Sequence, residues 1–153
     1  MIVVSDSTTL IILSDLDKFG YLKNLFLEVI IPQKVFEEIT YKNNITLPSF
    51  IKIENINTPL IEDLKLLLDD GESESIALAI QKNLPLIIDE KKGRKIAKNL
   101  NLKILGLLGI IYLNIKKGFV SITEAKEFLD LAQSNGYRIS QNLINDMFNK
   151  LKD

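Results

Sequence analysis

The chain contains no cysteine, no histidine and no tryptophan among its 153 residues. Without histidine and cysteine, it cannot form Ser-His-Asp or Cys-His catalytic sets, nor a metal site built on imidazole or thiolate ligands. It also cannot form disulfide bonds, which suits a reducing compartment. Any catalysis must therefore depend on carboxylates, hydroxyl groups, lysines or a bound ion.

Long apolar runs and an excess of charge of one sign are missing too. The longest apolar stretch, residues 107–113, is far shorter than the ~20 residues that cross a bilayer. Asp6 interrupts the apolar start of the chain, where a secretory signal would continue. The net charge of −1 gives no overall attraction to nucleic acid or to an anionic membrane. We expect a cytoplasmic protein that has no membrane segment.

Glycine and proline are sparse, with seven and four residues, and no repeat or linker divides the chain, so we expect a single domain, residues 1–153. Short runs of Ile, Val and Leu alternate with amphipathic stretches, which is typical of an α/β fold with a doubly wound parallel sheet. The predicted strands are residues 2–4, 29–31, 51–56, 86–88 and 102–105. The predicted helices are residues 22–26, a segment that starts at Pro32, 60–68, 73–82 and 91–101.

After Gly118 the pattern is purely helical. Ser121 and Glu124 have the spacing of a capping box at the start of a helix. Asn135-Gly136 ends that helix, and Ser140 is expected to cap a last one. We therefore expect an α/β core over residues 1–118 and a C-terminal helical hairpin over residues 119–153.

Acidic residues follow two of the predicted strands. Asp6 closes the first of them after Ser5, and Asp89 comes directly after Ile88. In open α/β sheets, ligands bind beyond the carboxyl ends of the strands, although an acid at this position can also be only a helix cap. Two such acids at one edge of the sheet favour an ion site.

Further acids in helical segments could converge on the same edge. Acids in the first turn of a helix complement its dipole, which is enough to explain Asp69, Asp70 and Glu72. The helix dipole explains Glu38 and Glu74 less well, because the residues next to them in the sequence are largely apolar. Carboxylates in one cleft repel one another unless a cation neutralises them, and oxygen ligands select Mg²⁺ or Mn²⁺. Such an ion activates water for phosphodiester hydrolysis.

The segment after Asp89 is the most basic part of the chain. It carries six cations and no acid as far as residue 103, namely Lys91, Lys92, Arg94, Lys95, Lys98 and Lys103. A basic run is often only a solvated helix face. Beside an acidic metal site, the same run would position a phosphate backbone.

Several segments together carry a family resemblance. They are VSDSTTLI (4–11), IPQKVFEEI (31–39), DGESESIALA (70–79), IIDEKKGR (87–94), GLLGI (106–110) and GYRIS (136–140). In these segments the chain resembles the PIN domain family, and within it a small prokaryotic subgroup of predicted nucleic-acid-binding proteins related to VapC-type toxins. The resemblance implies a parallel sheet of order 3-2-1-4-5 and a ribonuclease that depends on Mg²⁺ or Mn²⁺.

The resemblance also implies roles for individual residues. It assigns catalysis to four acids, Asp6, Glu38, Glu74 and Asp89. Of these, it makes three the metal ligands, Asp6, Glu74 and Asp89, and it adds Glu72 and Glu90 as further acids. Ser7 and Thr8 match the hydroxyl residues near the metal. The residues expected to bind the RNA backbone are Lys91, Lys92, Arg94, Lys95 and Lys98.

Partners and alternatives complete the sequence interpretation. The resemblance implies RNA as substrate, a homodimer, and a toxin of a type II toxin–antitoxin pair with a small antitoxin protein as partner. The alternative function is a PIN-like module that binds RNA or protein without cleaving it. Phosphate transfer through an aspartyl phosphate is disfavoured, because Asp6-Ser7-Thr8 lacks the second aspartate that such enzymes carry two residues on.

Overall fold

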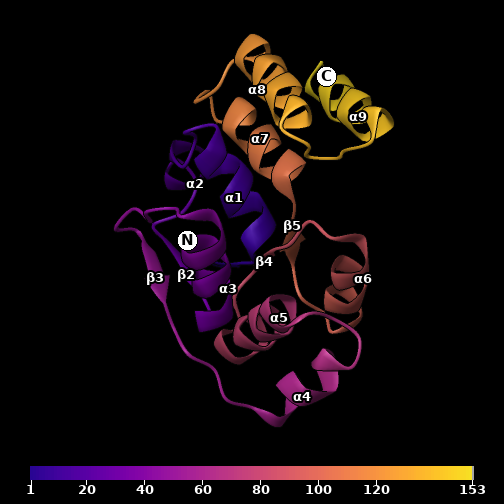
Figure 1. Cartoon of the computed structure of the whole chain (residues 1–153). Helices are drawn as coiled ribbons and strands as arrows, with labels where there is room; N and C mark the ends of the chain where they lie inside the picture. The colour runs from indigo at the N-terminus through magenta and orange to yellow at the C-terminus, as the bar shows by residue number, and fades with distance from the viewer. Residues whose placement is uncertain (153) are drawn as a thin grey trace.

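Five parallel strands form one sheet in the computed structural model, which describes residues 1–152 (Figure 1). The strands are β1 (Ile2–Ser5), β2 (Glu28–Ile31), β3 (Ile51–Ile53), β4 (Leu86–Ile87) and β5 (Ile104–Leu105). Their order is β3-β2-β1-β4-β5, and every neighbouring pair is parallel. The predicted sheet order is therefore confirmed, although β3 ends earlier and β5 begins later than the sequence pattern predicts.

The centre of the sheet determines where a ligand can bind. β1 pairs with β2 on one side and with β4 on the other, with Val4 opposite Leu86. Beyond β1, the backbone N–H of Asp6 donates a 2.9 Å hydrogen bond to the carbonyl of Ile87. The chain builds outward from β1 to β3 and then returns to β4, so the β1–β4 pair is the topological switch point, where a crevice opens at the carboxyl ends of the strands.

Helices cover both faces of this sheet, because alternate strand residues are apolar on both sides. Val3 and Ile87 belong to one buried cluster, and Val4 and Leu86 belong to another. Helices of the first cluster are α1 (Ser7–Asp15), α2 (Gly20–Lys23), α3 (Gln33–Glu37) with the π-helical turn η1 (Glu38–Lys42), α7 (Leu107–Lys116), α8 (Ile122–Ser134) and α9 (Gln141–Leu151). Helices of the second are α4 (Pro59–Lys65), α5 (Asp70–Lys82) and α6 (Lys91–Asn99).

Two of these helices, α1 and α7, are not among the predicted elements. Buried residues of α7 include Leu107, Ile110, Ile111 and Asn114, and its partly buried residues are largely apolar as well. Helices that are apolar on most faces show no 3.6-residue stripe, so their periodicity cannot be read from the sequence. None of the helices within residues 1–152 combines the length and apolarity needed to cross a membrane.

The C-terminal hairpin packs α8 and α9 against α7 (Figure 1). The predicted capping box is confirmed, because the Ser121 hydroxyl accepts a 3.0 Å hydrogen bond from the backbone N–H of Glu124 and the Glu124 carboxylate accepts one from Ser121. Gly136 follows α8 with φ +91°, as expected for a residue that ends a helix. The cap expected at Ser140 is wrong in one respect, since Ser140 occupies the N-cap position of α9 but its side chain makes no capping hydrogen bond.

A buried asparagine joins α7 to α2. The Asn114 side-chain amide donates to the carbonyl of Tyr21 at 3.0 Å and to the carbonyl of Ile110 at 2.8 Å. Its oxygen accepts a 2.9 Å hydrogen bond from Asn24. Asn114 is fully buried, so these partners cannot be replaced by water without a change in packing.

We expect Asn114→Ala to lower the free energy of unfolding by about 2 kcal/mol, because the carbonyl of Tyr21 loses its buried donor. Urea denaturation followed by circular dichroism measures this change. Asn149→Ala on the exposed side of α9 is the matched control, with an expected effect within about 0.5 kcal/mol. Equal stabilities of the two variants would contradict a structural role for Asn114.

Candidate functional site

Asp6 lies at the carboxyl end of the central strand β1. It occupies the N-cap position of α1, but its side chain makes no capping hydrogen bond. Asp6 is only 4% exposed. Burial raises the pKa of Asp6 to about 7, and the negative charges of Asp69, Glu38 and Asp89 contribute to the increase. Helix capping therefore does not explain this carboxylate.

Glu72 lies in the first turn of α5 and is also 4% exposed. Its backbone N–H donates a 2.8 Å hydrogen bond to the side chain of Asp69, the N-cap of the helix. Burial raises the pKa of Glu72 to about 9, and a side-chain hydrogen bond to Asp69 and the charges of Asp69, Asp6 and Glu90 contribute. The Oε2 atom of Glu72 is buried and has no hydrogen-bond partner. A buried oxygen of this kind is a donor atom available to a cation.

Glu38 is the first residue of the π-helical turn η1, an irregularity that is frequent at functional sites. Its Oε2 atom accepts a 2.8 Å hydrogen bond from the Ser7 hydroxyl. A Cβ atom at Gly71 would collide with Oε1 of Glu38, so glycine at this position lets the start of α5 lie against the carboxylate. Glu38 is thus held between the first turns of α1 and α5.

Asp89 follows β4, next to Asp6 across the switch point. Its Oδ2 atom accepts a hydrogen bond from the Thr9 hydroxyl, and Oδ1 accepts one of 3.1 Å from the backbone N–H of Leu107. A Cβ atom at Gly106 would lie 2.9 Å from Oδ1 of Asp89. Each carboxylate oxygen retains a second lone pair, so these contacts orient Asp89 and leave it able to bind a cation.

Glu90 and Thr8 lie toward the solvent. Glu90 is the exposed N-cap residue of α6, and its charge raises the pKa of Glu72, after the larger effects of burial and Asp69. Thr8 is exposed on α1 and borders a surface pocket together with Asp89 and Glu90. Ser7 is buried against Glu38, so the two hydroxyl residues have different surroundings.

The predicted RNA-binding cations lie on α6, which starts directly after these acids. Lys91, Lys92, Lys95 and Lys98 are exposed, and Arg94 is half-buried. The inner face of the helix is close to the site, because a Cβ atom at Gly93 would lie 2.6 Å from Oε2 of Glu72. In the described part of the chain, none of the ion pairs uses these five cations. The basic surface therefore borders the acids and remains available to anions.

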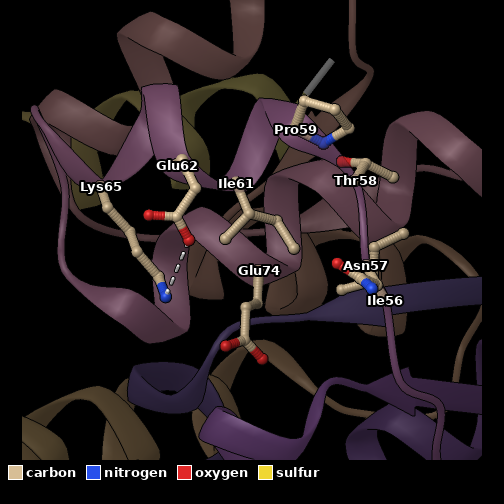
Figure 2. Close-up of a pocket in the computed structure, with 8 residues that line it drawn as sticks. All are labelled: Ile56, Asn57, Thr58, Pro59, Ile61, Glu62, Lys65 and Glu74. Atoms are coloured by element: carbon tan, nitrogen blue, oxygen red, sulfur yellow. Dashed lines mark ion pairs between the residues drawn. The ribbon is translucent and has the colours of Figure 1, made fainter.

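Glu74, which the sequence interpretation places among the metal ligands, lies apart from the acids described above. Figure 2 shows its carboxylate in a pocket bordered by α4, with the Glu62–Lys65 ion pair nearby. The backbone N–H of Lys34 donates a 3.4 Å hydrogen bond to it, and Glu74 is not among the charges that raise the pKa of Asp6 or Glu72. Residues two apart on a helix point in different directions, so α5 brings Glu72, and not Glu74, to Asp6.

Thr9 and Asp69 are functional candidates that the sequence interpretation did not select. Thr9 reaches Asp89 from the turn of α1 that follows Asp6. Because α1 was not predicted, the helical spacing between Asp6 and Thr9 could not be used. Asp69 was explained by the helix dipole alone, and only the folded chain shows that its charge acts on both Asp6 and Glu72.

Together these side chains form an acidic cluster at the switch point, composed of Asp6, Glu38, Asp69, Glu72, Asp89 and Glu90. Within residues 1–152, no three acids have the spacing of a formed metal site. The donor set nevertheless fits a hard divalent cation, since all its donors are oxygens, two carboxylates are buried, and Oε2 of Glu72 has no partner. The residues best placed to hold such an ion are Asp6, Glu72 and Asp89.

Comparisons with known proteins agree with this architecture. A solved structure, a PilT N-terminus domain protein from the hyperthermophilic archaeon Sulfolobus solfataricus, matches with a TM-score of 0.53 and 20% sequence identity, covering 72% of this chain and 91% of that one. This likeness concerns the fold alone. No match was found among curated proteins. A family model described as a PIN domain (DUF3368) matches residues 2–153. Since that match spans nearly the whole sequence, the chain belongs to the PIN domain family.

Proposed function

We propose that this PIN domain is a ribonuclease that hydrolyses phosphodiester bonds with the help of a bound Mg²⁺ or Mn²⁺ ion. PIN domains are generally nucleases that use divalent metals, which supports the class of reaction. The observation that carries the proposal is the buried and unpartnered Oε2 of Glu72 in the same acidic cluster as Asp6. Two buried carboxylates with raised pKa values are costly to ionise, and a divalent cation offsets that cost.

Three carboxylates would hold the ion, and two other groups of the chain fix the orientation of one of these carboxylates. Asp6, Glu72 and Asp89 are the proposed ligands, and Thr9 and the backbone of Leu107 orient Asp89. When bound, a divalent ion polarises a phosphoryl oxygen and lowers the pKa of water. This arrangement replaces Glu74 with Glu72 in the set of ligands.

Glu38 is suited to a different role from the ligands. Its Oε2 atom is fixed by the Ser7 hydroxyl, and its charge acts on Asp6. A carboxylate held in this way can orient an attacking water and accept its proton. We therefore propose that Glu38 orients the attacking water and accepts its proton.

The substrate is proposed from the surface that borders the acids. Lys91, Lys92, Lys95 and Lys98 expose their charges on α6, and Arg94 lies half-buried beside them. Cations arranged along a helix bind a phosphate backbone without reading its sequence. We propose RNA, and not DNA, as the substrate because the chain resembles VapC-type ribonucleases.

The same resemblance supports further proposals about partners. If this chain acts as the toxin of a cytoplasmic toxin–antitoxin pair, it would form a homodimer and would bind a small antitoxin protein. Exposed leucines on the C-terminal helices, Leu131 and Leu143, provide apolar surface for such contacts.

We expect Asp6→Asn to abolish Mn²⁺-dependent cleavage of single-stranded RNA, and Glu72→Gln to slow it by about 100-fold or more, because each change removes a charge that holds the ion. Glu74→Gln is the matched control on the same helix and should leave the rate within about 2-fold, since Glu74 occupies a separate pocket. Cleavage of a labelled oligonucleotide measures all three rates.

Circular dichroism of each variant shows whether it is folded, so that a loss of activity can be attributed to the site. Full activity of Asp6→Asn or Glu72→Gln would refute the proposed ligands. Wild-type protein that binds RNA and takes up Mn²⁺ without cleaving would favour the non-catalytic module instead.

We also expect the metal-free protein to lose stability as the pH rises. Burial raises the pKa of Asp6 from 3.8 to about 7 and that of Glu72 from 4.5 to about 9, with further increases from neighbouring acids. The folded state therefore binds more protons than the unfolded state above pH 4.5, and its stability decreases until the pH has passed both raised pKa values. The melting temperature in EDTA should fall between pH 5.5 and 8.5 in Tm scans.

Added Mg²⁺ should restore the melting temperature more at high pH than at low pH, because the ion binds ionised carboxylates. Glu72→Gln cannot titrate at this position, so its melting temperature should depend less on pH. A wild-type melting temperature that is constant with pH, and unaffected by Mg²⁺, would contradict this prediction.

A further inference from the structure

The connection between α8 and α9 reaches from the C-terminal hairpin back to the acidic cluster. Gly136, Tyr137 and Arg138 border a pocket of about 340 Å³ together with Thr8, Asp89 and Glu90. Figure 1 shows this connection beside the N-terminal end of α7. The pocket is called here the hairpin pocket, and it exists only because the hairpin folds against the α/β core.

Tyr137 contacts the acid that ends β4. It is half-buried, and burial, the charge of Asp89 and a hydrogen bond to Asp89 raise the pKa of its hydroxyl, while Arg94 opposes the increase. A Cβ atom at Gly106 would meet both Arg94 and Oδ1 of Asp89. The phenol, the carboxylate and the guanidinium group therefore meet at one point, in addition to the contacts from Thr9 and Leu107.

Arg138 is exposed at the border of the same pocket. It and Arg94 are the only two arginines of the sequence, and both are placed beside Asp89. In the part of the chain that the structure describes, no ion pair involves Arg138. The planar guanidinium group binds phosphate through two hydrogen bonds at once, which suits it to an RNA backbone.

We propose that the hairpin pocket holds the nucleotide next to the cleaved bond, with Arg138 binding its phosphate and Tyr137 acting as a positioning residue for Asp89. This inference rests on the proposed ribonuclease function. The volume lies at the lower end of the 300–1,000 Å³ that is typical of small-ligand sites, so it accommodates one nucleotide and not a folded RNA element. The Thr8 hydroxyl provides a hydrogen-bonding group for the sugar or base.

The first test separates binding from positioning in steady-state cleavage with Mn²⁺. We expect Arg138→Gln to raise KM by about 10-fold with little change in kcat, because it removes a charged hydrogen bond to the substrate. Tyr137→Phe removes only a hydroxyl, and it should weaken the apparent Mn²⁺ affinity by about 10-fold and leave KM for RNA unchanged. If the role of Tyr137 were purely structural, Tyr137→Phe would change the melting temperature and leave the apparent Mn²⁺ affinity unchanged.

The second test does not need activity. Fluorescence anisotropy with single-stranded RNA in EDTA, from 50 to 200 mM salt, measures the slope of log affinity against log salt. Loss of one phosphate contact in Arg138→Gln should reduce this slope by about 0.7. Lys150→Gln, an exposed lysine on α9 outside the pocket, makes the same change in charge and should keep the wild-type slope and KM.

The outcomes distinguish this inference from the proposed function. If Arg138→Gln behaves as Lys150→Gln does, the hairpin pocket does not bind the substrate. If Tyr137→Phe keeps wild-type Mn²⁺ affinity and kcat, its positioning role is refuted. Failure of the wild-type chain to cleave RNA would overturn the proposed function, and the anisotropy comparison would still decide whether Arg138 binds RNA.

Discussion

Two carboxylates buried within one acidic cluster are the constraint on which the candidate site depends. Asp6 and Glu72 are each only 4% exposed, and within residues 1–152 no ion pair places a lysine or arginine against either of them. The chain can offset the cost of burying these charges by taking up protons, or by binding a cation from solution. The stability of this edge of the sheet is therefore expected to depend on the same ion that the proposed hydrolysis would require.

The fold helps to hold these acids through the starts of its helices. In a parallel sheet, the helix after each strand begins at the carboxyl edge, so α1, α6 and α7 direct their positive dipole ends toward the cluster. The start of α5 lies there too, because the charge of its N-cap residue Asp69 acts on Asp6. The helix starts can lie this close to the acids only where a residue has no side chain. Glycine occupies these positions, since a Cβ atom at Gly71, Gly93 or Gly106 would meet Glu38, Glu72 or Asp89, respectively. The same dipoles that favour ionised carboxylates also favour a phosphate group beside them.

The sequence predicted the strands of the sheet well, but it predicted poorly where some helices begin and which of their residues are buried. Short, unalternated apolar runs identified all five strands, and Asp6 and Asp89 followed from their positions at two strand ends. The start of α5 was expected at Ser73, whereas the helix begins at Asp70 with Asp69 as its cap. That difference of one turn concealed the burial of Glu72 and favoured Glu74. Apolar residues on most faces concealed α7 altogether, and the contact of Thr9 with Asp89 spans too much sequence to be inferred from local spacing.

The C-terminal hairpin shows why the acids alone do not define the site. Tyr137 and Arg138 come from outside the predicted α/β core, yet they share a pocket with Asp89. The acids are positioned by strand ends and helix starts, which the packing of the sheet keeps fixed. In the connection between α8 and α9, Tyr137 and Ile139 pack against the core, whereas Arg138 is exposed and can change without disturbing the sheet. For the proposed ribonuclease, substrate preference should therefore depend on Arg138 in the hairpin, and hydrolysis on the acids at the switch point.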